Sequence, residues 1–350
     1  MTPLEKTIQQ ISPVDPAWIE AARRRQLELT KPPGSLGRLE EIANRCAAIR
    51  ASFALTAAKP RIVLFAADHG VCAEGVSAYP QEVTAQMVLN FLRGGAAINA
   101  LAGVAGIELK VVDAGVAAGL PHSEELITRR AAAGTKNFCK EAAMTELEMH
   151  TALEAGLDLA AEAASVGCDL LGIGEMGIGN TTAASAVTAA LTDRPVDDVV
   201  GRGAGADDDC LARKRSAIAR ALALHAPECR SPLGILRCVG GLEMASLCGF
   251  CLGAAAHRIP LVTDGFIATA ATALAVKVCP ASNDYFFAAH QSVEPGHGHL
   301  LAMLGLEPIL KLDMRLGEGT GAALAMKIVQ AAIAAFTQMA TFTSAAVSNR

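Results

Sequence analysis

The chain has 350 residues, of which 52% are hydrophobic, 4% aromatic and 19% charged. High apolar content with low charge excludes an intrinsically disordered chain, and the length suits one large domain or two smaller ones. The formal net charge is −5 and basic residues form only short clusters, so we expect no nucleic-acid partner.

Apolar runs that end in glycine or a polar residue predict the strands. These runs cover residues 61–67, 108–112, 168–173, 259–263 and 285–290, with a further one near 235–239. Helical patterns lie between them, at residues 82–92, 145–165, 181–191, 208–224, 242–256 and 265–278. The runs lack period-two alternation, so each strand should be covered on both faces. The alternation predicts an α/β fold, with a Rossmann-like parallel sheet of about six strands flanked by helices.

The two ends of the chain differ from this alternating pattern. Residues 1–58 and 319–350 have helical patterns without a good strand. Because chain termini often lie close in space, we expect a small helical domain built from both ends. Residues 59–318 should then form the large α/β domain.

Two uncharged stretches raise the question of a membrane span. Residues 244–256 are shorter than the roughly 20 residues that a bilayer requires. Residues 328–349 are longer, but polar side chains recur there at helical spacing, which predicts an amphipathic surface helix. These side chains are Gln330, Thr337, Thr341, Ser344 and Ser348. The opening MTPLEKTIQQ has no cationic-then-apolar signal pattern, so we expect a cytoplasmic protein without a membrane span.

The ten cysteines are scattered along the chain, which is typical of reduced, mostly buried thiols. Cys248 and Cys251 form a CxxC motif within an apolar stretch. No second pair stands at zinc-ribbon distance, so this pair is a weak indication of metal or redox chemistry.

Acidic residues and glycines follow one predicted strand after another. Ligands of open parallel sheets bind beyond the carboxyl ends of the strands. The junctions there are Asp68-His69-Gly70, Asp113-Ala114-Gly115, residues 174–177, Asp264-Gly265 and residues 291–294. Five such junctions at one edge of the sheet predict a polar site to which the backbone comes close.

The glycine-rich segment GIGEMGIGNTT, residues 172–182, follows a strand and opens a helix. Its glycines allow backbone amides to approach a ligand, and a helix N-terminus favours a phosphate. The segment contains GxGxxG, but no acidic residue ends a following strand some twenty residues later, and the Walker lysine is missing. A phosphate site is favoured, and a plain strand-to-helix turn remains an alternative.

In LDMRLGEGTGAALA, residues 312–325, Glu318 lies between two glycines directly before a helical pattern. The glycines let a ligand come close to its carboxyl. A carboxylate that a bound aromatic ligand partly desolvates has a raised pKa and can act as a general base. The alternative is a first-turn glutamate that the helix dipole stabilises.

The segment SVEPGHGHLL, residues 292–301, invites a metal interpretation. The possible ligands are Glu294, His297 and His299, with Asp68 and His69 as partners. The HxH spacing with a distant acid is loose and no zincin pattern is present. A loop that lines a phosphate or sugar site is the favoured interpretation.

Two further motifs gain meaning only from their context. KPPGSLGRLEEIA, residues 31–43, predicts a turn followed by a helix that Ser35 can cap. In AADHGVCAEGVSAYPQEVT, residues 66–84, a long polar loop carries Tyr79, one of only two tyrosines. That ring could stack on a flat ligand.

Taken together, these segments resemble the nicotinate-nucleotide–dimethylbenzimidazole phosphoribosyltransferase family, which makes the lower-ligand nucleotide of cobalamin. The matching blocks are KPPGSLGRLE (31–40), AADHGV (66–71), GVSAYPQEVT (75–84), GEMGIGNTT (174–182), GGLEMASLCG (240–249), DGFIATAA (264–271), SVEPGH (292–297) and RLGEGTGAAL (315–324). They occur in family order. The resemblance implies a homodimer and a six-stranded parallel sheet domain for nucleotide binding and catalysis, with a small helical domain from both termini.

The resemblance also implies a reaction. Nicotinate mononucleotide and 5,6-dimethylbenzimidazole would give α-ribazole 5′-phosphate and nicotinate, with inversion at the anomeric carbon and no metal or redox cofactor. Glu318 would be the general base. The nucleotide and its phosphate would be bound by Glu175, Gly177, Gly179, Asn180, Thr181, Lys214, Asp264, Gly265 and Ser292. The base acceptor would be bound by Ser77, Tyr79, Gln86, Leu316 and Gly317.

Three other functions compete with this one. The GxGxxG pattern would suit a nicotinamide-dinucleotide oxidoreductase. A metal-dependent hydrolase would use His69, Glu294, His297 and His299. A non-catalytic nucleotide-binding module would bind nicotinate mononucleotide without turnover.

Overall fold

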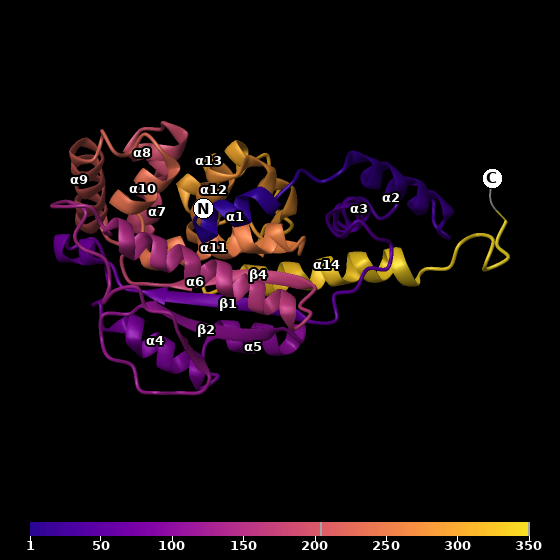
Figure 1. Cartoon of the computed structure of the whole chain (residues 1–350), viewed down its shortest axis with the longest axis horizontal. Helices are drawn as coiled ribbons and strands as arrows, with labels where there is room; N and C mark the ends of the chain where they lie inside the picture. The colour runs from indigo at the N-terminus through magenta and orange to yellow at the C-terminus, as the bar shows by residue number, and fades with distance from the viewer. Residues whose placement is uncertain (204, 349–350) are drawn as a thin grey trace.

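The computed structural model describes residues 1–203 and 205–348 and contains one parallel sheet of six strands (Figure 1). The strands are β1 (Pro60–Ala67), β2 (Glu108–Gly115), β3 (Leu126–Thr128), β4 (Leu170–Met176), β5 (Leu261–Thr263) and β6 (Phe286–Ala288). Their order in the sheet is β3-β2-β1-β4-β5-β6, and every pairing is parallel. The predicted α/β class is confirmed.

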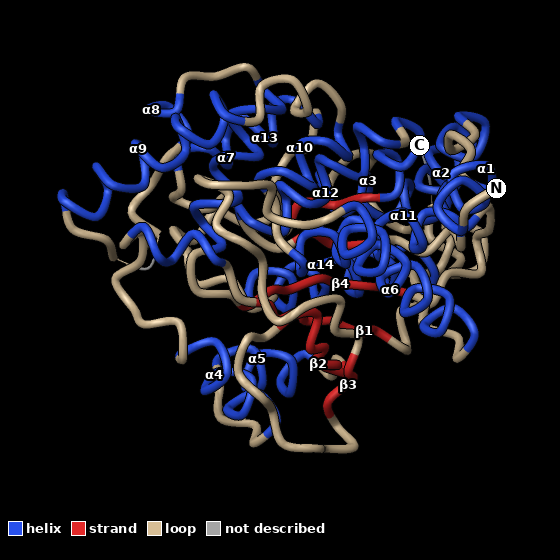
Figure 2. Tube along the Cα trace, turned by 60° about the vertical axis from the view of Figure 1, so that its left-hand side comes forward, coloured by secondary structure: helices blue, strands red, loops and turns tan. Residues whose placement is uncertain are grey.

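Helices cover both faces of this sheet, and Figure 2 shows the strands enclosed between them. In chain order the α-helices are α1 (Pro3–Gln10), α2 (Pro16–Glu28), α3 (Arg38–Arg50), α4 (Val83–Leu92), α5 (Ala97–Ala105), α6 (Glu146–Ser165), α7 (Asn180–Thr192), α8 (Val196–Val199), α9 (Asp208–Leu224), α10 (Pro232–Val239), α11 (Leu242–Ala256), α12 (Phe266–Val278), α13 (Pro295–Leu304) and α14 (Thr320–Gln338). Two short 3₁₀ helices, η1 (Gly70–Glu74) and η2 (Pro280–Tyr285), lie between them. Helices α11 and α12 pack on one face, and α4, α5 and α14 pack on the other.

Burial explains the strand pattern of the sequence. All eight residues of β1 are buried, as expected for a central strand with helices on both sides. The five main strand predictions and the six helix predictions are confirmed within a few residues. β5 and β6 are three residues each and shorter than their apolar runs.

The strand expected near residues 235–239 is wrong, because that segment is the helix α10. The Ser231 hydroxyl accepts a hydrogen bond from the Gly234 amide, and Pro232 occupies the first helical position. These start signals outweigh the apolar run that follows. The sixth strand of the sheet is instead β3, and of its three residues only Leu126 is buried. So short an edge strand leaves little periodicity to detect.

The surface helix expected over residues 328–349 is only partly confirmed, because it forms up to Gln338 and not beyond; residue 349 lies outside the described residues. α14 begins earlier, at Thr320, and ends at Gln338. Beyond it, the Thr341 hydroxyl accepts a hydrogen bond from the Ser344 amide, and such local bonds compete with a helix. The polar face of α14 is partly engaged as well, since the Gln330 side chain donates to the carbonyl of Ala57.

The helices from the two ends of the chain do not all pack in one place. α2, α3 and the second half of α14 pack together through Trp18, Phe53 and Phe336, whose rings meet edge to face (Figure 1). In contrast, α1 packs on α6 and α11, and α14 also contacts β4 and β5. The division into residues 59–318 and a helical domain of 1–58 plus 319–350 stays a prediction.

Two stretches are long and apolar enough to cross a membrane, by length and composition alone: Val83–Ala105 and Thr320–Gln338. The first is divided here into α4 and α5 by a turn near Gly94. The second is α14, which packs against the sheet. Core helices of soluble proteins pass the same test, so the expected absence of a membrane span stays a prediction.

Helices α6 and α11 pack so closely that side chains are excluded at their crossing. A Cβ added at Gly156 would lie 1.9 Å from the carbonyl oxygen of Ser246, and one at Gly249 would lie 2.0 Å from that of Leu153. α11 carries the CxxC pair in this buried layer, and burial raises the pKa of the Cys251 thiol to about 12. All ten cysteines, which lie in the described part of the chain, are free.

We expect Gly156→Ala to lower the free energy of unfolding by about 1–3 kcal/mol, because the added methyl forces the two backbones apart. Urea unfolding followed by circular dichroism measures the change. Gly103→Ala, within helix α5, is the matched control, since nothing lies within 4 Å of its added Cβ. The control should be neutral or slightly stabilising, and equal losses in both variants would contradict the packing argument.

Candidate active site

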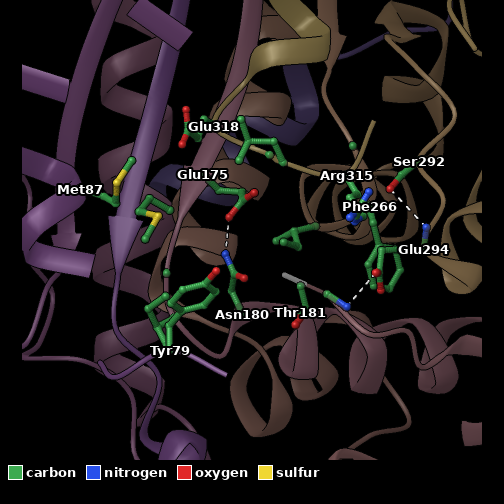
Figure 3. Close-up of a pocket in the computed structure, with 18 of the residues that line it drawn as sticks. Tyr79, Met87, Glu175, Asn180, Thr181, Phe266, Ser292, Glu294, Arg315 and Glu318 are labelled. Carbon is green, nitrogen blue, oxygen red and sulfur yellow. Dashed lines mark hydrogen bonds between the residues drawn. The ribbon is translucent and has the colours of Figure 1, made fainter. Parts of the chain in front are cut away.

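A cavity of about 370 Å³ opens at the carboxyl ends of the strands (Figure 3). Its walls come from the segments after β4, β5 and β6, from α4 and from the loop before α14. They are lined by Tyr79, Val83, Met87, Glu175, Met176, Gly177, Ile178, Asn180, Thr181, Gly203, Gly265, Phe266, Ile267, His290, Ser292, Glu294, Arg315, Leu316, Gly317 and Glu318. Three of the five predicted strand-end junctions contribute to this wall, namely residues 174–177, Asp264-Gly265 and residues 291–294, whereas Asp68-His69-Gly70 and Asp113-Ala114-Gly115 do not line it.

A smaller cavity of about 60 Å³ lies beside the first one and shares part of its wall. The shared residues are Tyr79, Gly177, Ile178, Asn180 and Thr181. The smaller cavity adds Val76, Ser77, Ala78, Gly179, Arg202, Ala206 and Lys214. Two cationic side chains therefore face the turn that starts α7.

That turn is built by glycines. Gly179 has a φ of 93° and precedes the first residue of α7, Asn180. A Cβ at Gly177 would lie 2.3 Å from the carbonyl oxygen of Ala67, so only glycine fits against the end of β1. The N-terminal amides of α7 and its dipole favour an anion at this end of the cavity.

Lys214 reaches the same turn from α9. Its side chain is 1% exposed, and Nζ donates to the Thr181 hydroxyl at 3.0 Å and to the Gly201 carbonyl at 3.1 Å. Burial lowers the pKa of Lys214, while the Glu294 carboxylate acts in the opposite direction. Glu294 accepts a hydrogen bond from the Gly203 amide at 2.9 Å, and its Oε2 is buried without a partner among the described residues.

Glu175 lies near the end of β4 and is 5% exposed. Its Oε2 accepts a hydrogen bond from the Asn180 side chain (Figure 3). Burial, followed by the charges of Glu243 and Asp264, raises the pKa of the Glu175 carboxyl well above its ordinary value. Gly317 has a φ of 87°, which favours glycine, and a Cβ there would lie 2.4 Å from Oε1 of Glu175, so any side chain would displace this carboxyl.

Glu318 lies on that loop and is also 5% exposed. Its Oε2 accepts a hydrogen bond from the Ile98 amide in the first turn of α5, at 3.4 Å. Burial and the nearby Asp264 charge raise the pKa of the Glu318 carboxyl, while the Ile98 hydrogen bond opposes them. A carboxyl that has a raised pKa and faces a cavity has the properties of a general base near neutral pH.

The part of the cavity next to Glu318 is apolar. Met87 and Val83 lie one turn apart on α4 and reach it together, and Leu316 and Tyr79 are half-exposed around them (Figure 3). Ser77 lies behind Tyr79, where its hydroxyl accepts a hydrogen bond from the Tyr79 amide at 3.1 Å. This wall suits a flat apolar ring.

The residues predicted from the sequence fall into three groups. Those on the main cavity wall are Tyr79, Glu175, Gly177, Asn180, Thr181, Gly265, Ser292, Leu316, Gly317 and Glu318. Ser77, Gly179 and Lys214 line the smaller cavity. Asp264 and Gln86 line neither: Asp264 is buried behind the wall, and Gln86 lies on the exposed side of α4. The ligand contacts of all these residues stay predictions.

Sequence reasoning missed Met87, Phe266, His290, Arg202 and Arg315 on the cavity walls. Val83 and Met87 have a detectable signal, because apolar residues four apart on a helix share a face. His290 lies two residues after β6, at the end of the predicted apolar run 285–290, and could have been included with the other strand ends. Arg202 and Arg315 lie in loops, where the spacing of residues does not indicate which way a side chain points.

The proposed metal ligands of the hydrolase alternative are separated. His69 Nε2 pairs with Glu243 at 2.8 Å, whereas the His297 ring nitrogens contact the Thr269 hydroxyl and the Ser292 amide. Over residues 1–203 and 205–348, no group of three histidine, cysteine or acidic side chains converges on one point.

The strand order 3-2-1-4-5-6 is that of dinucleotide-binding sheets. In those sheets the glycine fingerprint follows the first strand. Here its first two glycines, Gly172 and Gly174, lie inside β4, and the end of β1 leads into Asp68-His69-Gly70 instead. The oxidoreductase alternative therefore lacks its expected geometry.

Comparisons with known proteins agree over the whole chain. A family model described as phosphoribosyltransferase matches residues 11–347. The chain is 54% identical over 350 residues to the nicotinate-nucleotide–dimethylbenzimidazole phosphoribosyltransferase of Chloroflexus aggregans, covering 100% of this chain and 99% of the relative. It is 51% identical over 347 residues to the enzyme of the same name from Geobacter metallireducens, covering 99% and 98%.

Two crystal structures from Thermus thermophilus share the fold. One is described as the same phosphoribosyltransferase, with a TM-score of 0.90 at 49% identity, and the other as CobT, with a TM-score of 0.92 at 50% identity. Each similarity covers 96% of this chain and 100% of the other. The chain belongs to the nicotinate-nucleotide–dimethylbenzimidazole phosphoribosyltransferase family and is a phosphoribosyltransferase.

Proposed function

We propose that this enzyme transfers the 5-phosphoribosyl group of nicotinate mononucleotide to 5,6-dimethylbenzimidazole. The products are α-ribazole 5′-phosphate and nicotinate, and the reaction serves assembly of the cobalamin lower ligand. The relatives carry the two substrates in their names. The observation that carries the proposal is a cavity with a buried, pKa-raised carboxyl on its wall, adjoined at the start of α7 by a smaller cavity that is lined by the Lys214 cation.

The nucleotide phosphate binds at the start of α7. Gly177 and Gly179 offer backbone amides there, next to Asn180, whose own amide donates to the Gly177 carbonyl at 3.0 Å. Lys214, which donates to the Thr181 hydroxyl, supplies the positive charge. Glu175 and Gly265 lie next to the ribose and nicotinate, and Ser292 assists at the phosphate. The cationic pyridinium nitrogen of the donor is already a good leaving group, so nicotinate departs without a general acid.

The acceptor base occupies the apolar wall of Met87, Val83, Tyr79 and Leu316. From there one ring nitrogen attacks the anomeric carbon on the face opposite to nicotinate, which inverts the β-nucleotide to the α-product. The other ring nitrogen loses its proton to Glu318. This proton transfer is worth about 10²–10⁴-fold in rate, and alignment of the two substrates contributes more.

The remaining expectations are proposals of the same kind. The reaction as written requires no metal or redox cofactor. We also propose a cytoplasmic homodimer. The homodimer is what the family resemblance implies.

We expect Glu318→Gln to lower kcat by about 10²–10⁴-fold, because the isosteric amide cannot accept the benzimidazole proton. Product formation from the two substrates, followed by chromatography and mass detection, measures the rate. Circular dichroism checks that the variant is folded. Near-normal turnover would remove Glu318 from the proposed role.

The pH dependence gives a second test. Only the deprotonated Glu318 carboxyl accepts a proton, and its pKa is raised above the ordinary value of 4.5. We therefore expect kcat to fall on acidification with a midpoint above pH 4.5. Steady-state rates across pH values locate this midpoint. The residual activity of Glu318→Gln should lack this acid limb, and an unchanged limb in the variant would assign it to another group.

Lys214→Met should raise the KM for nicotinate mononucleotide by about 10–100-fold, because a charge-assisted contact to the phosphate is lost. The KM for dimethylbenzimidazole should change little. Lys277→Met, at an exposed position on α12, is the matched control. Equal effects on both KM values would indicate a structural role for Lys214 instead.

A further inference from the structure

The loop that carries Glu318 has a strained backbone. Gly317, Glu318 and Gly319 have φ values of 87°, 62° and 88°, so three successive residues adopt the left-handed region. Glycine enters this region freely, whereas glutamate does so only when its surroundings enforce it. Something outside the loop must therefore hold Glu318 in this conformation.

Asp264 provides that restraint from the end of β5. Its carboxylate is 1% exposed, with Oδ2 accepting a hydrogen bond from the Gly319 amide at 3.0 Å and Oδ1 accepting one from the Ala322 amide at 2.9 Å. The side chain thus caps the first turn of α14 and ties the third left-handed residue to the sheet.

The opposite side of the loop is fixed by β4. A Cβ at Gly174 would lie 2.5 Å from the Glu318 carbonyl oxygen and 2.6 Å from the Gly319 amide nitrogen. The backbone before α14 is therefore pressed against one strand and hydrogen-bonded to the residue that follows the next strand. In contrast, Asp264 does not line the cavity, and its two oxygens accept hydrogen bonds from the Gly319 amide just before α14 and the Ala322 amide within it. Its Oδ1 also lies 3.9 Å from Nε2 of His290, which does line the cavity.

We propose that Asp264 is a positioning residue for Glu318, whose carboxylate holds the left-handed turn that places the Glu318 carboxyl on the cavity wall. This inference rests on the proposed role of Glu318 as the base. It differs from the contact with ribose and nicotinate that the family resemblance implies for Asp264. A positioning residue should affect the chemical step, whereas a substrate contact should affect binding.

Several charged groups surround Glu318. Glu175 on β4, His290 after β6 and Arg315 on the same loop line the cavity with it, and Asp264 lies behind the wall. α5 presents the Ile98 amide to it. The negative charge of Asp264 is one cause of the raised pKa of Glu318. Removal of that charge should therefore lower this pKa and move the acid limb of kcat to lower pH.

The test is a double-mutant cycle of Asp264→Asn and Glu318→Gln in the full-length enzyme. We expect Asp264→Asn to lower kcat by about 10–100-fold, since small misplacements of a reacting group cost this much. KM for each substrate should stay within about threefold, and the acid limb should shift to lower pH. The double variant should be no slower than Glu318→Gln, because Asp264 acts only through Glu318.

Asp113→Asn is the matched control, because it also removes a buried carboxylate that accepts hydrogen bonds from two backbone amides. Asp113 is 3% exposed and accepts hydrogen bonds from the Gly115 and Val116 amides at 3.0 and 2.8 Å, but it lines neither cavity. The kcat of Asp113→Asn should match that of the unmodified enzyme, and only the free energy of unfolding measured in urea should fall.

The outcomes separate the two proposals. If Glu318→Gln is slow and Asp264→Asn has normal kcat, or raises only the KM of the nucleotide, the positioning role is overturned while the base assignment stands. Additive losses in the double variant also overturn it. If Glu318→Gln turns over at a near-normal rate, the base assignment fails and the positioning role fails with it.

Discussion

The close approach between β4 and the loop before α14 is the contact on which the site depends. Gly174 lacks a side chain at the point where the Glu318 carbonyl and the Gly319 amide press against the strand. On the same strand, Glu175 reaches into the cavity and is met by Gly317. One strand end therefore positions both buried carboxyls, and a methyl group at Gly174 would push the loop that carries Glu318 away from the strand.

Electrostatics divides the cavity into two ends. Burial raises the pKa values of Glu175 and Glu318, and the charges of Glu243 and Asp264 add to this for Glu175, as the charge of Asp264 does for Glu318. The opposite end meets the start of α7, where the adjoining smaller cavity is lined by Lys214. An anionic group is favoured at the second end and disfavoured at the first. A substrate with one phosphate is thus oriented by charge before its ring makes contact.

Much of the fold was predictable because its signals are local. A strand buried on both faces, such as β1, shows as an unbroken apolar run, and the helices between strands show their own periodicity. The failures have local causes too. Ser231 and Pro232 turned an apolar run into α10, and a three-residue edge strand left no pattern. Of the site, the glycine-rich turns and Glu318 were predictable, because helix starts and glycine flanks are visible in sequence.

The fold class, the family and the sheet edge that carries the site all follow from the sequence alone, because motif order and strand-end chemistry can be seen along the chain. What each side chain faces depends instead on tertiary packing. Asp264 follows a strand as Glu175 does, yet it turns to the amides of α14 while Glu175 lines the cavity. On α4, Met87 faces the cavity and its neighbour Gln86 faces away. These directions result from contacts between distant segments, which no local pattern encodes.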